Sequence, residues 1–447
     1  MLVLYVENFR GFTKQYIPLK DVNFFLGENS TGKTSILALI KLFSSPDFWL
    51  NQNFNAEEHQ FGNYGDIASV NAKDINYFRI GLIYYTEQQS EDKATEAYMS
   101  LMEFREGDGV PAIYKYCYTK DSSVFHVFFT DNTIKYMTTE IEYGKEPVKA
   151  IKQVFESCLV TEFNDAKLKE LKGSFPPYGK VPLRIIATII AYEHIKGKKQ
   201  TKRSDYPLQD ILYTPDFMEN VVWIAPMRSK PKRTYDQYID EFSSEGDHTP
   251  FLIRKKLKDK NTEQSQKFIN SIKKYGEESG LFKDIEINNL GNHPASPFEL
   301  KIVTEDKSLN ICNVGYGVSQ SLPILTELFK DEENDWYAIQ QPEVHLHPRA
   351  QAALGDVFFN LALKEKKRFF IETHSDFIVD RFRLNVNKAN KDKDSGVESQ
   401  VLFFEQRDGL NIVYPIEILP NGKYQDGMPE SFYSFFIKED LSILRLS

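Results

Sequence analysis

The segment that most constrains this chain is Gly27–Thr34, which reads GENSTGKT and matches the pattern G-x-x-x-x-G-K-[ST]. The apolar run Val22–Leu26 before it predicts a buried strand, and Ser35–Phe43 after it has the apolar spacing of a helix. Glycines in such a loop let backbone N–H groups turn toward an anion, and the helix N-terminus adds positive potential. The segment therefore predicts a nucleotide phosphate site, with Lys33 at the β and γ oxygens and Thr34 on Mg²⁺.

Three later segments have the composition expected of the rest of such a site. Asn313–Gln320 (NVGYGVSQ) places glycines and a Ser-Gln pair before a predicted helix, a second helix start suited to an anion. Trp336–Pro348 (WYAIQQPEVHLHP) begins as an apolar strand and ends in polar groups, where metal-binding and water-positioning groups are expected. Phe369–Ser375 (FFIETHS) is a strand ending near His374, which we expect to face the ligand crevice of an α/β sheet.

The order of predicted elements indicates an α/β fold with an insertion. Helices alternate with buried strands at both ends of the chain, which favours a parallel sheet. Strand-like runs from 74 to 130 and helices over 146–171 and 183–194 lie between them. We expect residues 1–70 and 300–447 to form a discontinuous nucleotide-binding domain and 71–299 an inserted β and helical lobe, with the basic loop 196–203 as a candidate boundary.

Charge, cysteine content and hydropathy indicate which binding partners and which cellular compartment to expect. The net charge of −9 disfavours a protein that coats nucleic acid, although the basic stretch Arg254–Lys260 offers a local phosphate-binding face or simply a solvated helix face. Cys117, Cys158 and Cys312 lie far apart in sequence, which argues against a disulfide scaffold and is typical of a reducing compartment. Since no run approaches the ~18 apolar residues of a membrane span, we expect a cytoplasmic protein with no membrane contact.

Taken in order, these motifs resemble those of the ABC-type ATPases of the SMC/RecF/OLD class. The resemblance is strongest to the compact prokaryotic "AAA" ATPases of anti-phage defence systems, such as the PARIS-type and the retron- or OLD-associated ATPases. It also rests on Asn8–Phe12, Pro226–Tyr235 and Pro429–Phe432. It implies an ABC-type P-loop domain, with a mixed or parallel sheet and flanking helices, that binds ATP and Mg²⁺.

The resemblance also implies roles for individual residues. Contacts to ATP and Mg²⁺ fall to the phosphate loop and its flanks: Arg10, Gly27, Asn29, Ser30, Gly32, Lys33, Thr34 and Ser35. Contacts to the γ-phosphate of a second protomer fall to Gly315, Gly317, Ser319 and Gln320, and His374 becomes the histidine that senses that phosphate. The implied partners are a second copy of the chain, in a dimer or higher oligomer, a separate effector such as a nuclease or toxin, and a DNA or phage-derived trigger.

One departure from the family pattern bears on hydrolysis. Such proteins usually end the metal-binding strand with Glu-Glu-Pro-Glu or Glu-Gln-Pro-Glu, whereas this chain has Gln340, Gln341, Pro342 and Glu343. A neutral amide such as Gln340 or Gln341 can still hold a hydrated Mg²⁺ or a water, with Gln340 as the metal candidate, but an amide is a poor general base. Glu343 is the nearest carboxylate. We expect slow or partner-triggered hydrolysis, and the alternative is that Glu343 takes the place of the missing acid.

Other functions remain open on these residues. A RecF/SMC-like DNA repair ATPase and a non-hydrolysing ATP-dependent scaffold fit the same motifs. The pair His345 and His347 offers a metal site, but without a nearby Cys or a matched pair of carboxylates.

Overall fold

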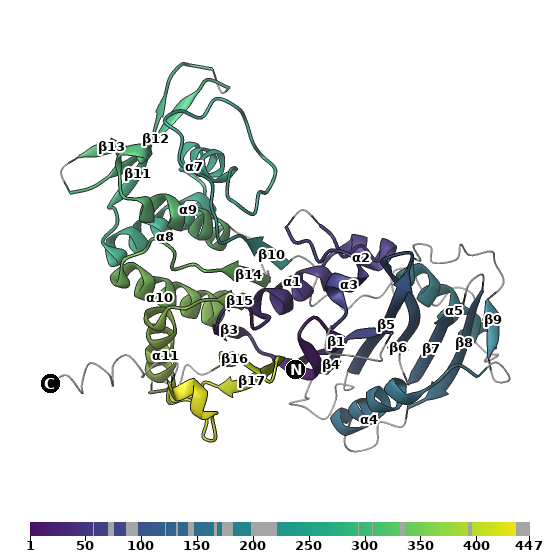
Figure 1. Ribbon diagram of the computed structural model, residues 1–447. Coiled ribbons are helices and arrows are strands. Elements are labelled where there is room, and N and C mark those ends of the chain that lie inside the picture. Colours follow the sequence, from purple (N-terminus) through teal and green to yellow (C-terminus); the bar gives the residue numbers. More distant parts are fainter. Residues whose placement is uncertain are drawn as a thin grey trace. The chain divides into compact units, whose positions relative to one another are not determined.

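The computed structural model describes residues 1–56, 58–69, 76–85, 97–120, 122–130, 133–141, 147–164, 168–171, 182–197, 221–293, 295–305, 307–330, 336–391 and 396–434. These residues form two compact units (Figure 1). Unit 1 draws on residues 1–20, 28–220 and 404–413, and unit 2 on residues 21–27, 221–403 and 414–447.

Unit 1 is built on an eight-stranded sheet whose neighbouring strands all pair antiparallel. In spatial order the strands are β2 (Phe12–Leu19), β1 (Leu2–Phe9), β4 (Phe78–Tyr85), β5 (Ala97–Gly107), β6 (Val110–Lys120), β7 (Ser123–Phe129), β8 (Ile134–Glu140) and β9 (Lys169–Leu171). Its helices are α1 (Lys33–Phe43), α2 (Pro46–Asn51), α3 (Tyr64–Ile67), α4 (Pro147–Val160) and α5 (Leu183–Gly197).

Helix α4 covers one face of this sheet because its apolar side recurs at helical spacing. Ile151, Phe155 and Cys158 from the helix share a buried core with sheet residues that include Tyr5 and Cys117. The rings of Tyr5 and Phe155 meet edge to face with centroids 5.0 Å apart.

Most of a six-stranded sheet flanked by helices belongs to unit 2, and residues 404–413 of its last two strands belong to unit 1. The strand order is β10 (Val221–Ile224), β14 (Trp336–Gln340), β15 (Arg368–Glu372), β3 (Val22–Gly27), β16 (Ser399–Arg407) and β17 (Leu410–Glu417), and β10 through β3 pair parallel. The helices are α7 (Thr249–Lys258), α8 (Glu263–Ser279), α9 (Tyr316–Phe329), α10 (Pro348–Glu365) and α11 (Asp376–Lys391). A small antiparallel sheet of β11 (Asp284–Asn289), β12 (Phe298–Val303) and β13 (Ser308–Asn310) leads into the short 3₁₀ helix Ile311–Asn313.

The central strands of the six-stranded sheet are mostly apolar because both faces are covered. Every residue of β3 and β14 is buried. The polar exception in β3 is Asn23, whose amide nitrogen donates to the Phe369 carbonyl at 3.2 Å and whose amide oxygen accepts from Gln400 at 2.7 Å. These bonds satisfy the buried amide and join β3 to the strands on both sides.

The α/β fold class predicted from the sequence is confirmed, but the units divide differently from the domains we expected. Strand β10 (Val221–Ile224) pairs with β14, so it belongs to the six-stranded sheet rather than to an inserted lobe. Strand β1 pairs with β4, so the first strand of the chain belongs to the antiparallel sheet. Long-range strand pairing, which periodicity does not reveal, sets both boundaries.

Two further expectations concern the helix over 146–171 and the basic loop 196–203. The helix expected over 146–171 ends at Val160, and Lys169–Leu171 instead forms β9 beside β8. Of the basic loop 196–203, residues 198–203 lie outside the described part of the chain. None of the helices in the described ranges combines the length and apolarity needed to cross a bilayer.

Candidate nucleotide site

The phosphate loop joins the end of β3 to the start of α1, as predicted. Ser30 and Gly32 have φ values of 63° and 93°, which place both in the left-handed region. A Cβ atom on Gly32 would lie 2.6 Å from the ring of Phe12, so only glycine fits this turn. Gly32 is also the N-cap of α1, which has no side-chain cap and no acidic residue in its first turn. The helix start is thus suited to an external anion.

Lys33 lies buried at the start of this helix, and its Nζ donates to the carbonyl oxygen of Glu28 at 2.6 Å. The hydroxyl of Thr31 donates to the same carbonyl at 2.8 Å. Asn29, Ser30 and Thr34 are exposed. The loop therefore folds around the Glu28 carbonyl and keeps the lysine cation inside it.

Arg10, which the resemblance places near the nucleotide, contacts Phe61 within unit 1. Its guanidinium donates to the Phe61 carbonyl at 3.0 Å and lies 5.1 Å from the Phe61 ring centroid. Burial lowers the pKa of Arg10, with Asp66 acting in the opposite direction. These contacts give Arg10 a structural role in holding the segment around Phe61.

A polar cluster lies where β14 and β15 end in unit 2, and it unites Gln340, Gln341, Glu343 and His374. The parallel register places Gln340 directly opposite Glu372. Gln340 Nε2 donates to Glu372 Oε2 at 3.2 Å, and both side chains are buried. Gln341 has a φ of 43° and donates its N–H to the Glu372 carbonyl at 2.7 Å. An acid from the neighbouring strand thus lies beside the amide at the usual acidic position.

Glu343 is held by the residues that follow β15. Its Oε2 accepts from the Thr373 hydroxyl at 2.7 Å, and its Oε1 accepts from the backbone N–H of His374 at 2.7 Å. The residue His374 is itself exposed. A backbone hydrogen bond therefore joins the Glu343 carboxylate to the residue predicted to sense the γ-phosphate.

Arg228, from the motif Pro226–Tyr235, lies behind this cluster. One guanidinium nitrogen, Nη2, donates to the Gln340 carbonyl at 3.0 Å, while Nε and Nη1 have no hydrogen-bond partner among the described residues. Burial lowers the pKa of Arg228 to about 10, and the charge of Glu343 acts in the opposite direction. A buried cation with two donors to spare is the chemistry expected next to a bound anion.

Close packing at Gly317 positions the start of helix α9. A Cβ atom on Gly317 would lie 3.0 Å from the His345 carbonyl oxygen, so the helix start packs closely against the loop after β14. Gly315 is exposed, with nothing within 4 Å of where a Cβ atom would lie. The start of α9 has neither a side-chain cap nor an acidic residue in its first turn.

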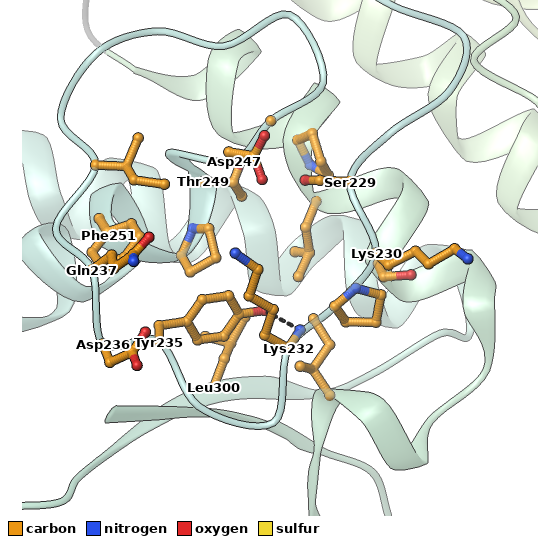
Figure 2. A pocket seen from close by; sticks show the side chains of 18 residues that line it. Ser229, Lys230, Lys232, Tyr235, Asp236, Gln237, Asp247, Thr249, Phe251 and Leu300 are labelled. Carbon is orange, nitrogen blue, oxygen red and sulfur yellow. Dashed lines mark hydrogen bonds between the residues drawn. The ribbon is translucent and has the colours of Figure 1, made fainter. Parts of the chain in front are cut away.

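Ser319 and Gln320 are buried within the same protomer. The Ser319 hydroxyl donates to the Tyr316 carbonyl at 2.8 Å, and Ser319 also lines the pocket drawn in Figure 2, beside Lys230, Lys232 and Thr249. Gln320 Nε2 is buried without a hydrogen-bond partner in the described ranges. Gly315, rather than the Ser-Gln pair, is the exposed part of the predicted partner-binding segment.

The two histidines after Glu343 have packing roles. The ring of His345 meets Tyr316 edge to face with centroids 5.1 Å apart, and His347 is the N-cap residue of α10. Sequence reasoning missed Glu372, Thr373 and Arg228 as members of the site. Glu372 ends one of two strands predicted to be parallel, which could have indicated a place near Gln340. That inference would have required the register between the two strands.

The model of a family described as AAA ATPase domain matches residues 2–379 of this chain. The chain belongs to that family. The match spans the phosphate loop, α9, and the ends of β14 and β15 in this AAA ATPase.

The AAA ATPase is also similar to solved SMC head domains, each at 11% sequence identity. One, bound to the C-winged helix domain of ScpA, has a TM-score of 0.41 and covers 93% of this chain and 97% of that chain. One from Thermotoga maritima has a TM-score of 0.38 and covers 93% and 98%. One with an extended coiled coil, bound to the C-terminal domain of ScpA derived from Pyrococcus furiosus, has a TM-score of 0.38 and covers 100% and 99%. A comparison with curated proteins gave no match.

Proposed function

We propose that this AAA ATPase binds ATP with Mg²⁺ in its phosphate loop and uses the nucleotide as a dimerisation switch. The observation that carries the proposal is the uncapped, left-handed Gly32 turn, which places Lys33 at the start of α1. The phosphate-loop residues Gly27, Asn29, Ser30, Gly32, Lys33, Thr34 and Ser35 would hold the nucleotide.

Two groups are suited to bind Mg²⁺, which would offset the phosphate charge: the Thr34 hydroxyl in unit 1 and, in unit 2, the strand end at Gln340. The donor set there is compatible with this ion. Gln340 donates through Nε2, which leaves Oε1 as its acceptor, and the Glu372 carboxylate lies beside it. Oxygen donors of this kind are the ligands that Mg²⁺ prefers.

We assign water activation to Glu343, because Thr373 and His374 fix the position of its carboxylate while each oxygen keeps a second lone pair. The rival base is Glu372. If Glu343→Gln lowers turnover at saturating ATP by at least ~100-fold while Glu372→Gln does not, Glu343 is the base. The converse result assigns Glu372. Thr373→Val should lower turnover by about tenfold without changing ATP affinity, since it removes one of two bonds that orient Glu343.

Nucleotide binding is tested with Lys33→Ala, for which we expect titration calorimetry with ATP and Mg²⁺ to show no binding. Thr34→Ala is the companion variant, and it should bind ATP more weakly with a reduced dependence on Mg²⁺. Unchanged ATP affinity in Lys33→Ala would remove the phosphate-loop assignment.

In the dimer, the start of α9 would face the γ-phosphate on the partner protomer. The exposed Gly315 supports this and offers a sharp test, because its φ of −57° suits any residue and its surroundings are open. Gly315→Glu should leave the melting temperature unchanged but abolish the mass increase that a nonhydrolysable ATP analogue causes in light scattering, since it sets a carboxylate against phosphate. Gly315→Ala is the neutral control. Normal dimerisation by Gly315→Glu would refute this use of α9.

The biological role that we propose is regulation of a separate effector, a nuclease or toxin, in response to a DNA or phage-derived trigger. It rests on the resemblance of the motifs to anti-phage ATPases. Cells carrying this gene with its neighbours should resist phage, and Lys33→Ala should remove that resistance. Equal plaque counts with and without the genes, across a broad phage panel, would count against the role.

A second candidate is a DNA-stimulated repair ATPase, favoured by a groove along α7. Its lining includes the basic residues Arg254, Lys255, Lys258, Lys260 and Lys273 and the acidic residues Asp259, Asp284 and Glu286, of which Asp284 pairs with Lys273 at 2.7 Å. If this candidate holds, duplex DNA should bind in a salt-sensitive manner and raise turnover, and Lys258→Glu should weaken both effects. ATP binding and dimerisation without turnover in any condition would instead identify a non-hydrolysing scaffold.

A further inference from the structure

A buried cluster in unit 1, separate from the nucleotide-binding residues, unites two thiols and an imidazole. Cys117 on β6 lies directly opposite His126 on β7, so both side chains are on the same face of the sheet. Cys158 approaches from α4, which covers that face. The two cysteines have no exposed surface and His126 has 3%. Among the described residues, this is the one group of three metal-ligating side chains gathered closely enough to share an ion.

The distances within the cluster suit a common ion. Sγ of Cys117 lies 3.5 Å and Sγ of Cys158 lies 3.9 Å from Nδ1 of His126, and all three ligand atoms lie within 4.8 Å of one another. Bonds of about 2.3 Å to sulfur and about 2.0 Å to nitrogen, with angles between tetrahedral and trigonal, require sulfur–nitrogen separations of about 3.5–3.7 Å. Both thiols converge on the same ring nitrogen, so one ion can bind all three.

The other ring nitrogen has the partner expected of a ligating histidine. Nε2 of His126 lies 3.5 Å from the Thr139 hydroxyl on β8. A metal-bound histidine usually donates its second N–H to such an oxygen, which fixes the tautomer with Nδ1 directed at the metal.

We propose that Cys117, His126 and Cys158 bind a thiophilic d¹⁰ cation, Cu⁺ or Zn²⁺. Both thiols lose their protons to solvent on binding, so the cation meets two thiolates and a neutral imidazole. The ammonium group of Lys115, which donates to the Cys158 carbonyl, adds one positive charge nearby. With Cu⁺ the buried charges sum to zero, and three ligands satisfy this ion. Zn²⁺ would leave a net charge of +1 and would require a fourth ligand. The charge balance thus favours Cu⁺.

Because the ligands are fully buried, the cation must enter as unit 1 folds, and it would tie α4 to the β6–β7 hairpin. The full-length chain should be produced in medium supplemented with either Zn²⁺ or Cu²⁺, the latter reduced in the cell, and purified with a reductant and without chelators. Elemental analysis should then give about one ion per chain. Retention of either cation supports the site, and the identity of the retained ion tests the charge argument.

The exposed Cys312 supplies a matched control. Cys312→Ser should keep about one ion per chain, whereas Cys117→Ser and Cys158→Ser should each keep less than about a tenth. If those two variants fail to fold, wild-type protein refolded with Co²⁺ should show sulfur-to-cobalt charge-transfer absorption in the near ultraviolet. Metal-free wild-type protein from both media, with no cobalt spectrum, would overturn the proposal. A Cys117–Cys158 disulfide in peptide mapping of the protein as purified under reductant would do so as well.

Discussion

Restoring an acid at position 340 should destabilise the protein in a pH-dependent way. Gln340→Glu would replace the donor Nε2 with an oxygen about as far from Glu372 Oε2, now 3.2 Å away, in a buried setting. Two carboxylates at that distance repel by about 5 kcal/mol at an effective dielectric constant of ~20. Keeping the introduced carboxyl protonated costs less than this repulsion. For a reference pKa of about 4.3, the cost of protonation is ~4 kcal/mol at pH 7 and ~1 kcal/mol at pH 5.

Proton linkage decides whether the variant gains or loses stability as the pH rises. The introduced carboxyl has a folded-state pKa above its unfolded value, so the native state binds more protons, and stability falls as pH rises above about 4.3. Urea denaturation at pH 5 and at pH 7 should show a variant that approaches wild-type stability only at the lower pH. Adding Mg²⁺ with ATP should recover most of the loss at pH 7 if the ion binds at this edge.

The matched control is the double variant Gln340→Glu with Glu372→Gln, which restores one acid and one amide to the pair. It should regain wild-type stability at pH 7 to within about 1 kcal/mol. If the single variant loses as much stability at pH 5 as at pH 7, or if the double variant is no more stable than the single one, the proposed carboxylate contact is wrong.

Two other substitutions test the Gly32 turn and a buried cluster in unit 2, where Glu327 lies 2.6 Å from His248 Nε2 and 2.8 Å from Lys330 Nζ. Gly32→Ala forces a Cβ atom into the Phe12 ring at a φ of 93°. The free energy of unfolding of unit 1 should therefore fall by about 2–4 kcal/mol, and ATP affinity should fall with it. An unchanged midpoint of urea denaturation would contradict this geometry. Burial opposes ionisation of Glu327, but hydrogen bonds and charges from His248 and Lys330 outweigh it and lower the Glu327 pKa. Since a carboxylate with a lowered pKa stabilises the fold above its unfolded pKa, wild-type stability should fall as pH drops below about 4.5. Glu327→Gln should cost about 3 kcal/mol at pH 7 and reduce that acid dependence, as measured by denaturation across pH 3–7.

Local patterns were enough to predict the phosphate loop. The apolar run Val22–Leu26 corresponds to β3, and the helical spacing of Ser35–Phe43 corresponds to α1. Both elements can be recognised from the order of their apolar side chains alone. The same holds for β14, whose apolar run ends at Gln340.

What sequence reasoning missed depends on strand register. Gln340 and Glu372 are neighbours only because β14 and β15 pair in parallel with their ends aligned. Cys117 and His126 are opposite each other for the equivalent reason in an antiparallel pair. The four-residue strand β10 has too few residues to show any period, so its membership of the parallel sheet could not be inferred from local pattern.

The position of β3 has a consequence for how the protein is made. This strand is synthesised well before its sheet neighbours β15 and β16, which come from residues 368–372 and 399–407. Until those strands are made, its six residues, all buried in the finished protein, have no partner strands to pair with. The nascent chain therefore offers chaperones an aromatic, aggregation-prone segment, and truncated products cannot complete the sheet that precedes the GENSTGKT turn.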